Sequence, residues 1–249
     1  LSGHMSAIDV LEKIVSGDAV FNEITVTIPE GFTLEQIAAR FEEVGLFSRE
    51  EFEAAAVVKE EFRDLWALAP LPEGKILEGY LFPDTYRIFP TSTPDTVIRR
   101  MVEHLQRVID GRIMADIEAS EHTLHEILTL ASIVQKESPE WDMPAIAGVF
   151  WNRLEIGQPL ESDATVNYVL GTSNLQPTFR DTEVQHPYNT YRNPGLPPGP
   201  IGNTGLAAID GTIHPDEHDF YFFLHKPTLE TVFSRTFQEH LAAKARYLD

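Results

Sequence analysis

The chain has 249 residues, 43% of them hydrophobic and 10% aromatic, and it carries a formal net charge of −20. This charge argues against a general nucleic-acid binder, which needs a surplus of Lys and Arg to neutralise phosphates, and equally against adhesion to an anionic membrane surface. The sequence contains no cysteine, which excludes disulfides, thiolate nucleophiles and Cys-ligated metals. A globular protein of mixed α and β structure remains, and an uncharged substrate such as a sugar chain is compatible with its acidic surface.

The first residues are not expected to belong to the fold. Residues 1–5 (LSGHM) resemble a cloning remnant, because His4-Met5 is typical of a cloning junction. The sequence has no run of roughly 18 to 20 apolar residues that would span a bilayer, and no signal-peptide pattern. We therefore expect residues 1–19 to be remnant and linker, and the native amino terminus to be missing.

The next segment predicts a small module. Residues 23–28 alternate and are rich in β-branched side chains, which predicts a strand. Thr33-Leu34-Glu35-Gln36 is a capping box, so a helix is expected to begin there and to stop at Gly45. Ser48 with Glu51 forms a second box and predicts a helix over 49–58. A strand and two helices in close succession make a compact βαα unit.

Further along, the segment 77–86 is predicted to be extended, with a turn at Pro83-Asp84. The stretch 157–203 is predicted to be a long irregular segment, and its aromatic residues favour an ordered, functional loop. The remaining predicted elements are helices at 94–110 (ended by Gly111), 122–137 and 144–156 (closed by Gly157), strands at 219–225 and 230–234, and a last helix from Thr236.

The helix at 122–137 carries the candidate chemistry. Apolar residues cover most of its circumference, so it is predicted to be buried on nearly all sides. Glu137 continues the apolar face one turn beyond Ile133, whereas Gln135 points nearly opposite. Poor solvation raises the pKa of a carboxyl group, and a protonated acid near neutral pH is what cleavage of a glycosidic bond needs. The pattern alone favours an exposed residue at a frayed helix end, because Pro139 follows closely.

Five separated blocks of sequence carry a family resemblance. They are LEGYLFPDTY at 77–86, LASIVQKE at 130–137, FWNRL at 150–154 with Ser162-Asp163 and Thr165-Val166 after it, YNTY at 188–191, and GLPPGPI at 195–201. In this order they resemble the endolytic murein transglycosylase family, also called YceG-like. The resemblance extends from residue 25 to residue 245.

The resemblance implies an α+β fold in two parts. A small LysM-like βαα module at 20–75 is followed by a YceG-like catalytic domain at 76–249, which mixes helices and short strands around a central buried helix. The catalytic acid is the last Glu of the central block, which here is Glu137. Gln135 stands where the family often has an acidic residue, so it cannot be the acid. Lys136 is expected to be a solvated surface charge. Asn203-Thr204-Gly205 replaces an expected Asn-Pro-Gly, a mild departure at a turn.

Several residues are candidates for substrate binding through the same resemblance. Glu137-Ser138 resembles the Glu-Ser pair of soluble lytic transglycosylases and goose-type lysozymes, and Tyr188-Asn189 resembles their Tyr-Asn pair. The tyrosine block fits simple loop packing equally well, and Asp163 fits a helix cap for 164–170 at least as well. The candidate substrate-binding residues are Ser138, Ser162, Asp163, Tyr188, Asn189 and Tyr191.

The implied activity is that of an endolytic peptidoglycan lytic transglycosylase. Such an enzyme cleaves the β-1,4 bond between N-acetylmuramic acid (MurNAc) and N-acetylglucosamine (GlcNAc) and leaves 1,6-anhydroMurNAc ends. One carboxyl group suffices because the muramyl 6-hydroxyl is an internal nucleophile of high effective molarity. A muramidase-type hydrolase would need a second carboxylate, for which Asp163 and Glu161 are candidates. The alternative of another class is a peptidoglycan-binding scaffold without activity.

No cofactor and no metal are expected. His214 and His218 are four residues apart, but Pro215 breaks the helix that a zincin-type site requires, and His186 and His225 have no ligand-like spacing. The resemblance implies peptidoglycan glycan strands as substrate and peptidoglycan polymerases (penicillin-binding proteins) as partners. It also implies a full-length protein anchored by one membrane span, with this part at the extracytoplasmic face of the bacterial cell membrane.

Overall fold

The protein is described here by a computed structural model that covers residues 6, 8, 23–138, 140–172, 174 and 177–248. The predicted remnant and linker at 1–19 lie outside the described residues, apart from residues 6 and 8, and so does Pro139. The fold is α+β, as expected, because the described residues combine helices with two small antiparallel sheets of two strands each. None of the helices in the described ranges combines the length and hydropathy needed to cross a bilayer.

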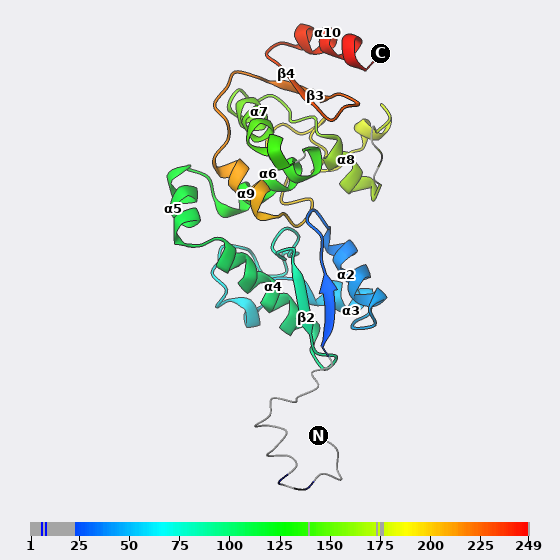
Figure 1. The fold of residues 1–249 in the computed structure, drawn as a ribbon, viewed down its shortest axis with the longest axis vertical. Helices are drawn as coiled ribbons and strands as arrows, with labels where there is room; N and C mark the ends of the chain where they lie inside the picture. The colour runs from blue at the N-terminus through cyan, green and yellow to red at the C-terminus, as the bar shows by residue number, and fades with distance from the viewer. Residues whose placement is uncertain are drawn as a thin grey trace.

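The predicted first strand pairs with a strand much later in the chain. Strand β1 (Ile24–Thr27) lies antiparallel to β2 (Thr85–Ile88), with Val26 opposite Tyr86, and both of these side chains are buried. The sheet therefore joins the two sides of the predicted boundary at residue 75, and the division into domains stays a prediction. Figure 1 shows β1 and β2 side by side in the lower part of the molecule, with α2, α3 and α4 around them.

The two predicted capping boxes begin the helices of the first module. Thr33 and Gln36 exchange hydrogen bonds at the start of α2 (Leu34–Glu43), and Ser48 and Glu51 do so at the start of α3 (Arg49–Ala55). Helix α3 ends three residues before the predicted end at 58. The chain leaves the helix there because Val57 bridges to Ile76, and the backbone N–H of Val58 donates to the carbonyl of Lys75.

The prediction that Gly111 ends a helix is wrong. Helix α4 (Pro94–Val108) ends earlier, and Gly111 is the first residue of a further helix, α5 (Gly111–Ala119). The side chain of Asp110 accepts hydrogen bonds from the amides of Arg112 and Ile113, which satisfies two of the free N–H groups of the first turn. The capping aspartate thus decides the local structure, and the glycine beside it does not.

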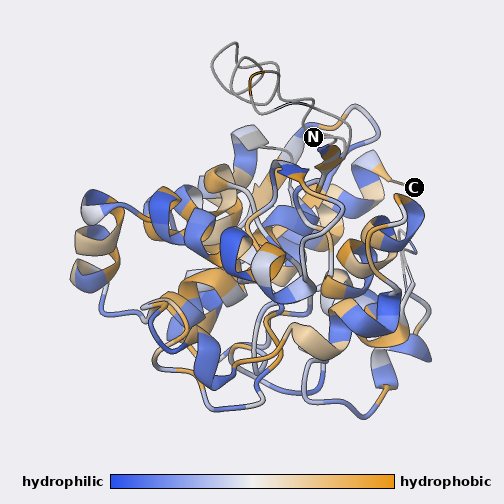
Figure 2. Ribbon diagram, turned by 90° about the horizontal axis from the view of Figure 1, so that it is seen from below, coloured by the Kyte–Doolittle hydropathy of each residue, from blue (hydrophilic) through white to orange (hydrophobic). Residues whose placement is uncertain are grey.

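The central helix α6 (Leu124–Glu137) is buried as expected, since every side chain from Ile127 to Val134 is inaccessible. It packs against α7, α8 and α9. Helix α9 was not predicted from the sequence, because its residues are apolar on most sides and its amino-terminal Gly205 makes no side-chain cap. In Figure 1 these helices form the upper part of the molecule, and in Figure 2 hydrophilic and hydrophobic residues alternate along most helices.

The carboxyl-terminal region follows its predicted order. A hairpin of two strands leads to a last helix that Thr236 and Glu239 cap, and both the hairpin and the helix lie beyond α7 in Figure 1. The remaining elements are η1 (Glu60–Phe62), η2 (Glu140–Asp142), α7 (Met143–Glu155), α8 (Asp163–Leu170), η3 (Asp181–Glu183), α9 (Leu206–Ile213), β3 (Phe222–His225), β4 (Thr231–Ser234) and α10 (Phe237–Tyr247).

Glycine substitutions test the close approach of the backbone at Gly79 to the ring of Pro200. Gly79 has φ +86°, and a Cβ there would overlap the ring of Pro200, whereas Gly74 has φ +76° with open space around it. In both G74A and G79A the free energy of unfolding should fall by about 1–2 kcal/mol, because a residue with a Cβ is strained in the left-handed backbone conformation. G79A should lose about 1–3 kcal/mol more for overpacking, measured by urea unfolding. Equal losses in the two variants would show that Pro200 yields and that the contact is loose.

Candidate active site

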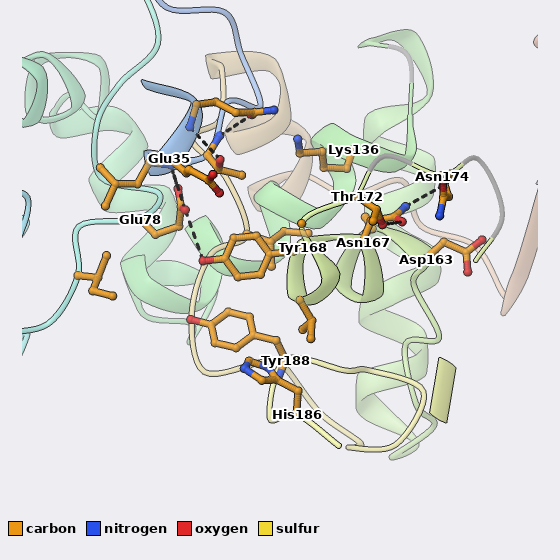
Figure 3. Close-up of a pocket in the computed structure, with 18 of the residues that line it drawn as sticks. Glu35, Glu78, Lys136, Asp163, Asn167, Tyr168, Thr172, Asn174, His186 and Tyr188 are labelled. Carbon is orange, nitrogen blue, oxygen red and sulfur yellow. Dashed lines mark hydrogen bonds between the residues drawn. The ribbon is translucent and has the colours of Figure 1, made fainter. Parts of the chain in front are cut away.

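A cavity of about 1300 Å³ lies between the first module and the helices of the upper part. Its walls come from α2 and α3 on one side and from the end of α6, α8 and the loop that follows on the other. Glu137, Asp163 and Tyr188, three of the predicted site residues, line it together. Figure 3 shows four lining residues of this cavity, with Lys136 at the top of the view, Tyr168 near its centre, Asp163 at the right and Tyr188 below. The volume exceeds that of a typical small-molecule pocket and suits a longer ligand.

Glu137 is the last residue of α6, and its side chain is partly buried at the cavity wall. Its Oε1 accepts a hydrogen bond from the hydroxyl of Ser162 at 2.5 Å and a longer one from the backbone N–H of Ala164 at 3.5 Å. The backbone carbonyl of Glu137 accepts a hydrogen bond from Nε2 of His225 at 2.8 Å. Both ends of the residue are therefore held, and the expectation of an exposed residue at a frayed helix end is wrong.

The electrostatic setting of Glu137 favours its neutral form. Burial raises the pKa of the carboxyl group, the hydrogen bond from Ser162 lowers it, and the nearby charge of Asp163 raises it, with a raised pKa as the result. Burial dominates because a carboxylate loses its hydration among apolar side chains. This is the direction expected from the apolar phase of the helix, and it gives the group a proton to donate.

Ser162 and Asp163 stand at the start of α8. Ser162 occupies the N-cap position but makes no side-chain cap, because its hydroxyl donates to Glu137 instead. Asp163 is the first helical residue, so the alternative that it caps the helix is wrong. Its Oδ1 accepts a hydrogen bond from the hydroxyl of Tyr191 at 2.6 Å, and it lines the cavity. Glu161, the other candidate second carboxylate, is exposed and lies 3.4 Å from the guanidinium of Arg153.

The tyrosine block divides between cavity and loop. Tyr188 lines the cavity, and its ring centroid lies 5.2 Å from that of Tyr168. Asn189 is fully buried, and its Nδ2 donates to the carbonyls of Thr182 and Val184 at 2.9 and 2.8 Å. The Asn189 side chain is therefore engaged within its own loop and faces that loop, not the cavity. The alternative of loop packing holds for this residue.

Ser138 and Tyr191 lie next to the cavity wall. Ser138 follows the helix directly, and its backbone N–H donates to the carbonyl of Val134 at 3.1 Å. The described wall of the cavity runs through Glu137 and does not include Ser138. Tyr191 is not among the described wall residues, but its hydroxyl donates a hydrogen bond to Asp163, which lines the cavity.

Glu78 and Tyr168 are among the wall residues that the sequence analysis does not predict. Glu78 lies within the LEGYLFPDTY block and Tyr168 lies in none of the five blocks, yet both line the cavity. Glu78 stands between the apolar residues Leu77 and Tyr80, and this placement of a charge was the one signal available. Lys136 is exposed at the same wall, as expected. Within the described ranges no cluster of three or more His, Asp or Glu side chains is arranged to hold a metal ion.

Comparisons with known proteins identify what this chain is similar to. The model of the YceG-like family matches residues 1–246. The chain is 34% identical over 253 residues to an endolytic murein transglycosylase of Bacillus subtilis (strain 168), covering 96% of this chain and 69% of that protein. It is 32% identical over 266 residues to an endolytic murein transglycosylase of Streptococcus pneumoniae (strain D39), of which it spans 48%. A crystal structure of a YceG-like protein from Listeria monocytogenes superimposes with a TM-score of 0.80 at 32% identity, covering 98% of this chain and 83% of that one.

The raised pKa of Glu137 predicts how stability depends on pH. Glu137 titrates near 4.5 when unfolded and higher when folded, so its favourable contribution is complete below 4.5 and is lost as pH rises through the folded pKa. The free energy of unfolding of Glu137→Gln, measured with urea, should therefore equal that of the wild type at pH 4 and be higher at pH 8. The gain should be about 1.4 kcal/mol for each unit by which the pKa is raised.

Glu126→Gln provides a control of opposite sign in the same helix. The backbone N–H of Thr123 holds the pKa of Glu126 below its usual value, so this carboxylate stabilises the fold above its unfolded pKa. Glu126→Gln should be less stable than the wild type at pH 8, with a smaller difference at pH 4. A Glu137→Gln variant that also loses stability at pH 8 would contradict the burial of an unfavourable charge.

Proposed function

This chain belongs to the YceG-like family, and we propose that it is a lytic transglycosylase that cleaves the β-1,4 bond between MurNAc and GlcNAc within peptidoglycan glycan strands. The proposed products carry 1,6-anhydroMurNAc ends. The observation that carries the proposal is the carboxyl group of Glu137, which has a raised pKa and a hydrogen bond from Ser162 at the wall of a large cavity. The names of the curated relatives support peptidoglycan as the substrate.

In the proposed mechanism, Glu137 acts first as an acid and then as a base. Its proton passes to the oxygen that links MurNAc to GlcNAc, the bond from C1 to that oxygen breaks, and positive charge develops at C1 with help from the acetamido group of the sugar. The ionised Glu137 then takes the proton of the muramyl 6-hydroxyl, whose oxygen bonds to C1. No water enters, and Glu137 ends protonated as it began.

The neighbouring residues have separate proposed roles. Ser162 orients the carboxyl group and stabilises its ionised form between the two steps. Tyr188 and Tyr168 offer ring faces to the sugars, and Asp163, Tyr191 and Ser138 contact the strand close to the cleaved bond. Asn189 supports this site indirectly, because it holds the loop on which Tyr188 lies.

A muramidase is the second candidate function, and one observation favours it. Asp163 lines the same cavity as Glu137 and raises its pKa, so a second carboxylate is available near the acid. A hydrolase would use this carboxylate as a nucleophile or to activate water. We prefer the transglycosylase because the curated relatives carry that name and because Asp163 is held by the hydroxyl of Tyr191.

We propose the cellular setting on the same grounds. A protein that cuts glycan strands acts outside the cytoplasm, so we place this part of the chain at the extracytoplasmic face of a bacterial membrane, with a membrane anchor in the full-length protein. Peptidoglycan polymerases are the proposed partners. The first module, at residues 20–75, is proposed to be LysM-like, from its succession of one strand and two helices.

Product analysis tests the proposed reaction. Mass spectrometry of purified peptidoglycan after digestion should show new anhydromuramyl ends with the wild-type chain and none with Glu137→Gln. Asp163→Asn should still give anhydromuramyl ends, at a lower rate. Reducing muramyl ends without anhydro ends, abolished by Asp163→Asn, would establish the muramidase instead, and strand cleavage by Glu137→Gln at the wild-type rate would refute the assigned acid.

The role of Ser162 predicts a displaced pH profile. Its hydroxyl lowers the pKa of Glu137, so Ser162→Ala should raise this pKa and move the alkaline limb of kcat to higher pH. The same variant should lower kcat by about tenfold, because a hydrogen bond to a charged group is worth about 1.5–3 kcal/mol. Thr165→Ser serves as the control, because it keeps the hydroxyl that donates to the backbone carbonyl of Ser162 and removes only a methyl group in the same helix. An alkaline limb that stays in place in Ser162→Ala would show that the hydroxyl does not stabilise the ionised acid.

A further inference from the structure

A second buried carboxyl group belongs to the cavity. Glu78 is only 7% exposed, and it lies on the segment between α3 and β2. It lines the same cavity as Glu137, but the proposed mechanism makes no use of it. A buried carboxyl group is unfavourable unless its oxygens find hydrogen-bond donors, so the partners of Glu78 indicate its role.

The partners of Glu78 come from three separate parts of the chain. The backbone N–H of Leu34, the first residue of α2, donates to Oε1 at 3.0 Å and to Oε2 at 3.1 Å. The side-chain Nδ2 of Asn203 donates to Oε1 at 3.0 Å. The hydroxyl of Tyr168, on α8, lies 3.4 Å from Oε2. One carboxyl group therefore joins a helix of the first module, a helix of the upper part and the segment after the GLPPGPI block.

Asn203 extends this junction on both sides. It is fully buried, its Oδ1 accepts from the amide of Leu81 at 2.9 Å, and its Nδ2 also donates to the carbonyl of Phe32 at 3.0 Å. Its backbone exchanges two further hydrogen bonds with the turn before α2, from the amide of Gly31 to its carbonyl and from its own amide to Phe32. The start of α2 is thus fastened to the upper part through Asn203 and Glu78.

The opposite side of the carboxyl group leads to the aromatic wall. The hydroxyl of Tyr168 contacts Glu78, and the ring of Tyr168 packs against that of Tyr188. Figure 3 shows the hydroxyl of Tyr168 pointing toward Glu78, with Asp163 on the far side of the view. Glu78 is therefore attached to the wall that would contact the sugars. In this view it lies on the side opposite Asp163, the neighbour of the proposed acid Glu137.

We infer that Glu78 is a positioning residue for glycan binding, which holds the first turn of α2 and the hydroxyl of Tyr168 at the separation that the strand requires. This inference rests on the proposed function. It assigns to Glu78 an effect on the affinity for the strand, and it leaves the chemical step to Glu137 and Ser162.

The titration of Glu78 gives this role a pH dependence that can be measured. Burial raises its pKa to about 7, while hydrogen bonds from Leu34 and Tyr168 and the charge of Lys136 on α6 lower it. In the ionised form the Tyr168 hydroxyl donates to Oε2. In the neutral form Oε2–H donates to the Tyr168 oxygen instead, while Oε1 still accepts from Leu34 and Asn203. Since the raised pKa means that the joined arrangement binds the proton more tightly, ionisation above about pH 7 weakens the junction.

The test compares Glu78→Gln and Glu78→Leu across pH with purified glycan strands. For the wild type, KM should rise as pH increases from 6 to 8. Glu78→Gln keeps an acceptor for Leu34 and a donor for Tyr168, so its KM should stay near the wild-type value at pH 6 and should not change with pH. Glu78→Leu removes the acceptor for two buried donors, and its KM should be about tenfold higher at every pH. In both variants kcat should stay within about twofold of wild type, since the group acts on binding.

Glu51→Gln is the matched control, because Glu51 accepts the backbone N–H of Ser48 at the start of α3 within the first module and is not part of the cavity wall described. It should leave KM and its pH dependence unchanged. If Glu78→Leu does not fold, the flat profile of Glu78→Gln still decides the matter. A KM in Glu78→Gln that varies with pH as in the wild type would overturn the inference.

A binding measurement separates this inference from the proposed reaction. The dissociation constant for glycan strands is measured by calorimetry in the Glu137→Gln background, with and without Glu78→Leu. A tenfold weaker binding caused by Glu78→Leu supports the positioning role even if the wild type produces no anhydromuramyl ends. Equal binding would refute it even if the wild type cleaves as proposed.

Discussion

A carboxyl group at the end of a helix buried on nearly all sides is the constraint on which the rest of the structure depends. Helix α6 has no solvated face from Ile127 to Val134, so Glu137 leaves the apolar interior only at the cavity wall. The start of α8 provides a hydroxyl for its side chain, and strand β3 provides a ring N–H for its backbone carbonyl. Burial by α7, α8 and α9 therefore sets both where the group points and how readily it keeps its proton.

Two carboxyl groups at one cavity divide two tasks. The pKa of Glu137 is raised, and among the described residues the group accepts one short hydrogen bond, from Ser162, an arrangement that leaves it reactive. Glu78 also has a raised pKa, but its oxygens are engaged by donors from two helices and one loop, an arrangement that makes it structural. The first group is suited to transfer a proton, and the second is suited to hold two walls in place.

Local chemistry made much of the fold predictable, and long-range contacts limited the rest. The boxes at Thr33 and Ser48 located helix starts because each involves residues three apart. The burial of Glu137 followed from helical phase, since neighbours on a helix face are fixed by the backbone. Its bond to Ser162 crosses 25 residues, and the bond of Glu78 to Asn203 crosses 125, and no pattern in a single sequence encodes such pairs. The same limit explains why the sequence predicts Asn189 as a substrate-binding residue, although its side chain forms hydrogen bonds within its own loop.

The fate of water oxygen tests ring closure most directly. Glycan strands are digested with the wild-type chain in water enriched in ¹⁸O, alongside a muramidase digest of the same strands, and the new muramyl ends are analysed by mass spectrometry. If Glu137 only relays a proton to and from the sugar, the new ends are anhydromuramyl and contain no ¹⁸O, whereas the muramidase ends contain it at C1. New ends that are reducing and carry ¹⁸O at C1 in both digests would contradict ring closure and would make Asp163 the group that activates water.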